Sequence, residues 1–274
     1  MKLGLNQWAF TAAYSTERAI RLTSEMGYES MEVCAGEDGP ISFKSTRSSL
    51  AAIRKQANAS GLEISSVACA SGWLYPVTAI DEEVRERGVQ ATIRTMEIAH
   101  ELHVDTIVIV PGKVSIEAYF DVAFANARIA FQRLIPVAER LGVTIALENV
   151  RNNFLLSPVE MINFLDQFGS PHVKACLNTG NLLSQGHPEQ WVQKLGKRIQ
   201  RVHMKDHKTP THLNEGPVPL GTGDVNWPMV MRALRNIGYT GALIADVTGA
   251  KSAPETVIHE ALVQLRKLRA LLPA

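Results

Sequence analysis

The sequence is poor in cysteine and carries no excess of either charge, and each absence excludes a class of protein. Its three cysteines, Cys34, Cys69 and Cys176, are an odd number without regular spacing, which argues against a disulfide framework. Each lies in or just after an expected strand, so we expect buried free thiols and a reducing, cytoplasmic location. The net charge of +1, without a run of Lys or Arg, gives no reason to expect a nucleic acid as partner.

Long apolar runs and phosphate-binding loops are also missing. No apolar stretch approaches the roughly 18 residues that span a bilayer, and the N-terminus reads directly as a strand. We therefore expect neither a membrane segment nor a signal peptide. The turn after the first expected strand, residues 7–10, contains no glycine, which argues against an open, doubly wound nucleotide-binding sheet. A Walker loop and a nucleophile elbow are absent as well.

A repeated helix–strand junction organises the chain. Glycine stands where an expected helix ends with positive φ, at Gly27, Gly61, Gly142 and Gly238. The junction at His103 keeps the same register without glycine. Between the junctions, apolar runs alternate with amphipathic segments, which predicts strands at 2–8, 30–34, 63–69, 106–110, 144–148, 173–178, 199–203 and 241–246 and a last helix at 255–272. Eight such units predict a single α/β domain, a (β/α)8 TIM barrel covering residues 1–274.

Four consecutive expected strands end on residues that bind divalent metals: Glu148, Asn178, His203 and Asp246. Taken singly, each residue has a simpler interpretation. Glu148 would form a salt bridge and Asn178 would hydrogen-bond a turn. His203 would be a structural histidine and Asp246 would cap a loop. Because the carboxyl ends of parallel barrel strands meet on one face, we expect the four to surround one ion. Two carboxylates, an amide oxygen and an imidazole suit Mn²⁺ or Mg²⁺ and also accommodate Zn²⁺ or Co²⁺.

Other residues on the same face are candidates for substrate binding. The loop 219–223 brings the backbone N–H groups of Gly221 and Gly223 near a helix start, where they suit a phosphate or simply form a tight turn. Lys205 suits an anionic substrate or a solvated basic loop. Three more residues are candidates. Trp8 and Trp73 are suited to stack on a sugar or simply to pack against barrel loops. Arg151 is suited to orient the substrate or merely to balance charge.

Several motifs resemble the xylose isomerase-like family of sugar isomerase and epimerase barrels, and within it the ketose 3-epimerases, including those acting on L-xylulose or L-ribulose 5-phosphate. The motifs are Leu147-Glu148-Asn149, Asn178-Thr179-Gly180-Asn181, Val202-His203-Met204-Lys205-Asp206 and Pro219-Leu220-Gly221-Thr222-Gly223. The resemblance implies a metal held by the four strand-end residues, with Glu148 and Asp246 as an acid/base pair beside an enediolate. It also implies a small-molecule sugar substrate, a role for Asn181 in binding it, and association into a homo-oligomer.

Two departures from the family pattern weaken the expected site. Asn178 stands where the family has Asp, and Asp246 stands where it has Glu. The ligand set therefore has two negative charges instead of three, so we expect a metal that is weakly bound or absent. Two alternatives stay open: a non-catalytic, sugar-binding relative, and a lyase or dehydratase that shares the enolate-forming step. A DNA-repair endonuclease of this fold ranks low, because the extra metal-binding histidines and a basic face are missing.

Overall fold

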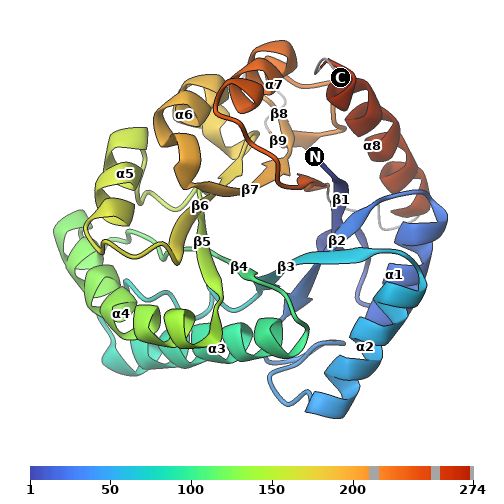
Figure 1. Cartoon of the computed structure of the whole chain (residues 1–274). Helices are drawn as coiled ribbons and strands as arrows, with labels where there is room; N and C mark the ends of the chain where they lie inside the picture. Colours follow the sequence, from blue (N-terminus) through green and yellow to red (C-terminus); the bar gives the residue numbers. More distant parts are fainter. Residues whose placement is uncertain (210–215, 248–253, 272–274) are drawn as a thin grey trace. The chain divides into compact units, whose positions relative to one another are not determined.

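A computed structural model of the chain describes residues 1–209, 216–247 and 254–271. Eight strands form a closed barrel in the order β1-β10-β7-β6-β5-β4-β3-β2 (Figure 1). The pairings of β1 with β2 and β10, of β10 with β7, and of β4 with β3 and β5 are parallel. The predicted TIM barrel is therefore confirmed. No helix within the described residues is both long and apolar enough to cross a membrane.

The barrel strands lie within two residues of their predicted bounds at either end. They are β1 (Leu3–Asn6), β2 (Ser30–Ala35), β3 (Glu63–Cys69), β4 (Thr106–Ile109), β5 (Thr144–Glu148), β6 (Val173–Asn178), β7 (Ile199–Met204) and β10 (Leu243–Ala245). An antiparallel pair after β7 was not predicted, and consists of β8 (Asp206–Lys208) and β9 (Gly216–Val218).

Helices follow the strands as the repeat predicts. The α-helices of the described residues are α1 (Thr16–Glu25), α2 (Arg47–Ala59), α3 (Glu82–Glu101), α4 (Phe120–Leu141), α5 (Pro158–Asp166), α6 (Pro188–Leu195), α7 (Trp227–Asn236) and α8 (Pro254–Arg269). Three short 3-10 helices accompany them: η1 (Gln7–Ala9), η2 (Asn181–Ser184) and η3 (Gly196–Arg198). Ser157 caps α5 by accepting from the backbone N–H of Glu160, as its capping-box sequence indicates.

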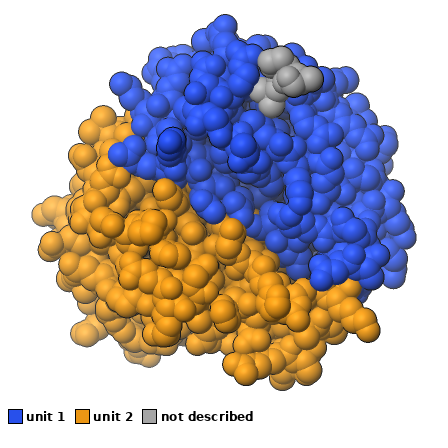
Figure 2. Space-filling model, viewed as in Figure 1, with its two compact units in different colours: residues 1–32, 56–65, 176–274 blue, residues 33–55, 66–175 orange. Residues whose placement is uncertain are grey.

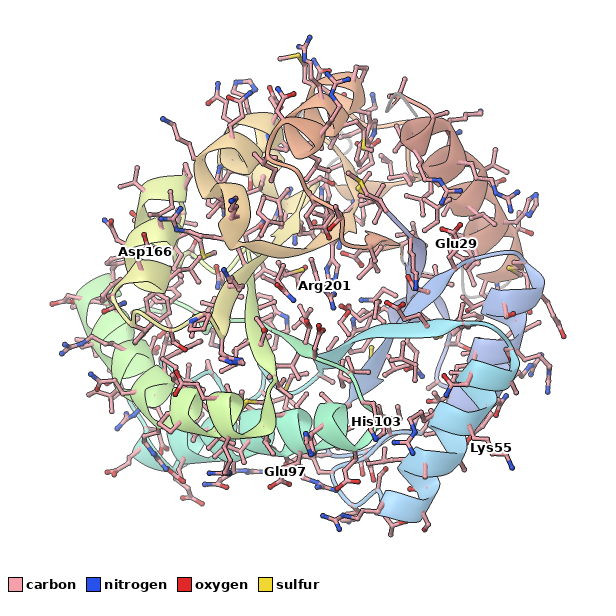
Figure 3. The ribbon with its side chains drawn as sticks, in the orientation of Figure 1. Glu29, Lys55, Glu97, His103, Asp166 and Arg201 are labelled. Atoms are coloured by element: carbon pink, nitrogen blue, oxygen red, sulfur yellow. The ribbon has the colours of Figure 1, made fainter. Side chains whose placement is uncertain are left out.

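The chain divides into two compact units, shown in blue and orange in Figure 2. Unit 1 comprises residues 1–32, 56–65 and 176–274. Within it β1 pairs with β10 and β10 with β7, and α6 lies beside α7 (Figure 1). The guanidinium of Arg201, which extends from β7 (Figure 3), donates to the carbonyl of Ser65 at 2.6 and 3.0 Å. Arg201 thus ties β7 to the beginning of β3.

Unit 2 comprises residues 33–55 and 66–175. Its β4 pairs with β3 and β5, and α3 packs along α4. Five phenylalanines with neighbouring ring centroids 5.2–6.4 Å apart fill the space around α4 and α5: Phe124, Phe131, Phe154, Phe164 and Phe168. This aromatic cluster supplies a large apolar contact area for the unit. Whether the chain is one domain stays a prediction.

The helix–strand junctions have the positive φ that the repeat predicts. Gly142 ends α4 with φ of 64° and ψ of 31°. His103 occupies the same left-handed region, with φ of 59°, after α3 (labelled in Figure 3). A side chain in this region costs on the order of 1 kcal/mol that glycine avoids. The junction without glycine therefore keeps its geometry at an energetic cost.

Exchanging these two residue types tests that cost. We expect His103→Gly to raise the free energy of unfolding by roughly 0.5 kcal/mol, because relief of the strained φ exceeds the entropy that glycine adds to the unfolded chain. Gly142→Ala is the matched reverse change, because nothing lies within 4 Å of the added Cβ. It should lower stability by about 1 kcal/mol in urea unfolding. A destabilised His103→Gly variant would contradict this account.

Candidate functional site

Three buried polar residues of unit 1 meet through the register of its strands. Asn6 ends β1, Glu32 lies in β2 and His203 lies in β7, and their side chains are 0–2% exposed. Asn6 is the register partner of Glu32, and its Nδ2 donates to Glu32 Oε1 at 2.5 Å. The same carboxylate oxygen lies 3.0 Å from His203 Nε2. The strand-end histidine therefore faces a buried carboxylate that the sequence did not single out.

Asp246 is the centre of a second polar cluster in unit 1. It directly follows β10, and its backbone N–H donates to the carbonyl of Met204 at 3.1 Å. Its Oδ2 accepts from Asn178 Nδ2 at 2.8 Å and from Lys205 Nζ at 3.0 Å. The side chains of Asp246 and Lys205 are only 13% and 19% exposed, so the ion pair is largely removed from solvent.

Asn178 directs its amide nitrogen, not its oxygen, toward Asp246. Its Oδ1 accepts from the backbone N–H of Asn181 at 3.2 Å, at the beginning of η2. A backbone N–H can only donate and a carboxylate can only accept, so these two neighbours fix which way the amide faces. In this structure Asn178 orients Asp246. Its predicted role as an oxygen ligand to a metal stays a prediction.

The charges around Asp246 favour its ionised form. Burial raises the pKa of Asp246, but the positive charges of Lys205 and His203 and the hydrogen bonds from Lys205 and Asn178 outweigh it. The pKa is therefore held below its usual value, and Asp246 is a carboxylate at neutral pH.

Three of the four predicted ligands can serve one ion. Glu148, the last residue of β5, His203 and Asp246 each offer a ligand atom, and these atoms lie within 4.8 Å of one another. Two carboxylate oxygens and an imidazole nitrogen are donors that Mn²⁺, Zn²⁺ and Co²⁺ accept, and the oxygens also suit Mg²⁺. By the chemistry of its donors, this group fits a divalent metal ion.

The loop predicted to hold a phosphate is organised by Asp206 instead. The Asp206 carboxylate accepts from the N–H groups of Gly221 at 2.9 Å and Gly223 at 3.0 Å, and from Trp227 Nε1 at 3.0 Å. A Cβ on Gly223 would lie 2.0 Å from Asp206 Oδ1, so only glycine allows this approach. The two backbone N–H groups that we expected to bind a phosphate are thus already used by a carboxylate of the chain.

The remaining predicted substrate residues lie after strands of the two units. In unit 1, Trp8 is 48% exposed in η1 after β1, whereas Asn181 is 9% exposed in η2 after β6. In unit 2, Trp73 is 48% exposed after β3, and Arg151 is exposed after β5. Their roles in binding a sugar stay predictions.

Sequence reasoning missed Asn6, Glu32 and the role of Asp206. One signal was available for Glu32, since it interrupts an apolar strand between Met31 and Val33, and a charged residue there needs a buried partner. Nothing in the local sequence identified His203 as the neighbour.

Comparisons with known proteins agree with the fold. The model of a family described as Xylose isomerase-like TIM barrel matches residues 20–268. L-ribulose-5-phosphate 3-epimerase UlaE of Salmonella heidelberg is 22% identical over 248 residues, 89% of this chain and 86% of that protein. The protein MJ1311 of Methanocaldococcus jannaschii is 25% identical over 182 residues, 64% of this chain and 61% of that protein. The crystal structure of a D-psicose 3-epimerase in the presence of D-fructose superposes with a TM-score of 0.82 at 19% identity and covers 100% of both chains.

The Asp206 loop gives a prediction about stability. Asp206→Asn keeps the shape of the side chain but replaces one acceptor oxygen by a donor, which leaves buried N–H groups unsatisfied. We expect the free energy of unfolding to fall by roughly 2–4 kcal/mol in urea denaturation. The control is Asp224→Asn, since Asp224 is a more exposed carboxylate that pairs with Lys208. It should change stability little, and equal losses in the two variants would contradict the role of Asp206.

The ion pair of Asp246 gives a pH-dependent prediction. A lowered pKa contributes stability that is fully present above the unfolded value of about 3.9 and is lost as pH falls through the folded value. The variant Lys205→Met removes the ammonium group that most strongly lowers the pKa of Asp246. Burial then raises this pKa, and the ionised carboxylate destabilises the folded state. The loss of unfolding free energy should be roughly 2–4 kcal/mol at pH 7 and should shrink toward pH 4.

The control for that measurement is Lys208→Met, which removes the ammonium from the more exposed pair with Asp224. Its loss at pH 7 should be much smaller, because solvent screens the pair. If the loss in Lys205→Met is the same at pH 7 and pH 4, the charge of Asp246 is not what Lys205 stabilises.

Proposed function

Because the chain belongs to the xylose isomerase-like TIM barrel family, we propose that it is a divalent-metal-dependent isomerase or epimerase of a ketose or ketose phosphate. The observation that carries this proposal is the group formed by Glu148, His203 and Asp246. It is supported by the similarity to an L-ribulose-5-phosphate 3-epimerase and to a D-psicose 3-epimerase.

The residues present would divide the reaction between two carboxylates. A bound divalent ion would polarise the substrate carbonyl and acidify the neighbouring C–H group. One carboxylate, Glu148 or Asp246, takes the proton from that carbon and leaves an enediolate. The other returns a proton, on the opposite face for an epimerisation. His203 would complete the metal ligands.

The position and the charge of the Asp246 carboxylate suit it to act as the base. Lys205 and Asn178 hold its carboxylate in place through Oδ2 and keep it ionised. A fixed, ionised carboxylate requires no reorganisation before it accepts a proton. Lys205 also brings an ammonium group beside the acid/base residue, where it can donate to a substrate hydroxyl or to the enediolate oxygen.

Substrate recognition would fall to the residues after the strand ends. We propose that Trp8 and Trp73 stack on the sugar, and that Asn181 and Arg151 bind its hydroxyl groups. Gly221 and Gly223 shape the loop after β9, but Asp206 occupies their N–H groups. This occupation favours an unphosphorylated ketose over a ketose phosphate at that loop.

A sugar-binding protein without catalysis is the second candidate, and one observation favours it. Asn178 and Lys205 both donate to Asp246, so a second cation at that carboxylate competes with an ammonium already in place. Metal affinity would then be weak. In that case, restoring Asp at 178 and Glu at 246 should create tight metal binding that the wild type lacks.

The experiment combines metal binding with solvent isotope exchange. The purified chain is stripped of metal, titrated with Mn²⁺, Mg²⁺, Co²⁺ or Zn²⁺ by calorimetry, and incubated in D₂O with free ketoses and ketose 5-phosphates. We expect deuterium at the carbon beside the carbonyl, without loss of water from the sugar. Deuterium uptake with loss of water would indicate a dehydratase instead.

Two variants and a control assign the carboxylates. Glu148→Gln and Asp246→Asn should each lower kcat by about 10²–10⁴, because each removes one proton-transfer group. Glu97→Gln changes a surface glutamate of unit 2 (labelled in Figure 3), which pairs with Arg94, and should leave kcat unchanged. A chain that exchanges no deuterium with any ketose and any of the four metals is not an isomerase of this kind.

A further inference from the structure

Unit 2 contains a pocket that the proposed reaction does not use. Its volume is about 540 Å³, and its walls come from the loop after β3, the beginning of α3 and the loop after β4. Pockets of roughly 300–1,000 Å³ are typical of small-molecule sites. The apolar residues that line it are Leu74, Pro76, Ile80, Val84 and Ala118. The pocket therefore has the size and the apolar lining that a small-molecule site needs.

Buried hydrogen bonds hold the two loops in this arrangement. Thr78, which is 0% exposed, donates from Oγ1 to the carbonyl of Lys113 at 2.6 Å and accepts from the N–H of Lys113 at 2.8 Å. Gly112 has a φ of 118°, and a Cβ at this position would lie 2.3 Å from Thr78 Cγ2. Glycine thus lets the second loop approach Thr78 closely. Because the walls are already fixed, a ligand does not have to order them when it binds.

The second loop is also attached to the segment that follows Glu148. The strands β3, β4 and β5 are parallel, so the loops after them leave the same end of unit 2. Asn152, which is 3% exposed in the loop after β5, donates from Nδ2 to the carbonyl of Gly112 at 2.6 Å. Its own carbonyl accepts from the N–H of Val114 at 2.9 Å. One wall of the pocket is therefore fixed to the loop that begins at a proposed acid/base residue.

The other wall begins beside Trp73, which we proposed to stack on the sugar. Leu74 directly follows Trp73, lines the pocket and is 67% exposed. Ile80 lines it as well and is 53% exposed. An apolar group that covers these two side chains removes them from water, which favours its binding. A sugar on Trp73 would thus lie next to a place for an apolar group.

The charged residues of the pocket favour a neutral ligand. Lys113 is an exposed cation, whereas Asp81 and Glu117 are exposed carboxylates. Asp81 Oδ1 already accepts from the N–H groups of Glu83 and Val84 at the beginning of α3. Charges of both signs around one pocket do not create a strong field for an ion of either sign.

We propose that this pocket binds an apolar substituent of the substrate, which is a ketose carrying an alkyl or aryl group at the end remote from its carbonyl. The sugar part of this inference rests on the proposed function, whereas the binding of the apolar group does not. The substituent lies against Leu74 and Ile80 while the sugar stacks on Trp73. An ether, an ester or a glycoside supplies the same apolar group, and the pocket selects the group, not its linkage.

A second copy of the chain is the alternative occupant of this surface. Ile116 and Tyr119, which follow β4, are 88% and 67% exposed, so exposed apolar side chains also occur beyond the pocket. A two-fold contact between copies would bury such residues. The concave shape of the pocket favours a small molecule, and sedimentation distinguishes the two occupants.

The experiment compares substituted with free sugars. Calorimetry on the purified chain, without metal and with Mn²⁺, measures the dissociation constants of each D-ketohexose and of its 6-O-benzyl ether. For at least one ketohexose, we expect the benzyl ether to bind about 10–100 times more tightly, because the pocket removes the aryl group from water. Ile80→Glu should reduce this preference to less than about twofold, since the entering aryl group would desolvate a carboxylate.

The matched control is Ile129→Glu. Ile129 is an isoleucine of α4 in the same unit, outside the pocket, and its exposure of 54% equals that of Ile80 within one per cent. This variant should keep the preference for the benzyl ether.

Three results would overturn the proposal. The first is a wild type that binds no benzyl ether more tightly than its free sugar, whether or not the variants fold. The second is an equal preference in Ile80→Glu and Ile129→Glu, because the aryl group then binds elsewhere. The third is a wild-type dimer that Ile80→Glu dissociates in sedimentation, because a second copy then covers the pocket. If the preference is found but no ketose exchanges deuterium with any metal, the pocket stands and the proposed isomerase function fails.

Discussion

The parallel register of β1, β2, β7 and β10 decides which side chains meet in unit 1. In this register Asn6 stands opposite Glu32, and His203 stands opposite Ile244, two residues before Asp246. A shift of the register by one residue would turn every side chain of a strand to its other face, so all of these side-chain contacts would be lost. The polar clusters of unit 1 exist because apolar neighbours such as Leu5 and Met31 hold the strands in place.

Once the register is set, charge balance governs the polar clusters. Unit 1 holds Glu32 and Asp246 as carboxylates with little or no exposure, and Lys205 as the ammonium beside Asp246. An aspartate at position 178 would place a second negative charge where Asn178 Nδ2 now lies 2.8 Å from Asp246 Oδ2. Two carboxylates at that distance repel each other unless a cation or a shared proton lies between them. Asparagine removes the repulsion by donating, and Lys205 supplies part of the positive charge.

Features fixed by local sequence could be predicted well. The glycine junctions mark helix ends because positive φ suits glycine wherever it occurs, and the strand limits follow from short apolar runs between them. The ends of the strands therefore drew attention to Glu148, His203 and Asp246, whose ligand atoms lie within 4.8 Å of one another in the structure. The closed barrel followed from counting the repeats.

Features that depend on distant partners could not be predicted. The amide of Asn178 faces Asp246, 68 residues away, and only that meeting shows that it donates rather than accepts. The loop 219–223 looked suited to an anion because its glycines expose N–H groups, and it is indeed suited to one. The anion is the carboxylate of Asp206, about fifteen residues earlier in the chain, and no local pattern distinguishes it from a phosphate.

The two polar clusters of unit 1 have opposite effects on the binding of a cation. The Glu32 side favours a cation near His203, because the buried carboxylate adds a negative charge 3.0 Å from Nε2 of the ring. The Lys205 side disfavours one at Asp246, because an ammonium already neutralises that carboxylate. A divalent ion would therefore gain most from His203 and least from Asp246. In a site with asparagine at 178, affinity for the ion thus depends on the residues behind the ligands as much as on the ligands.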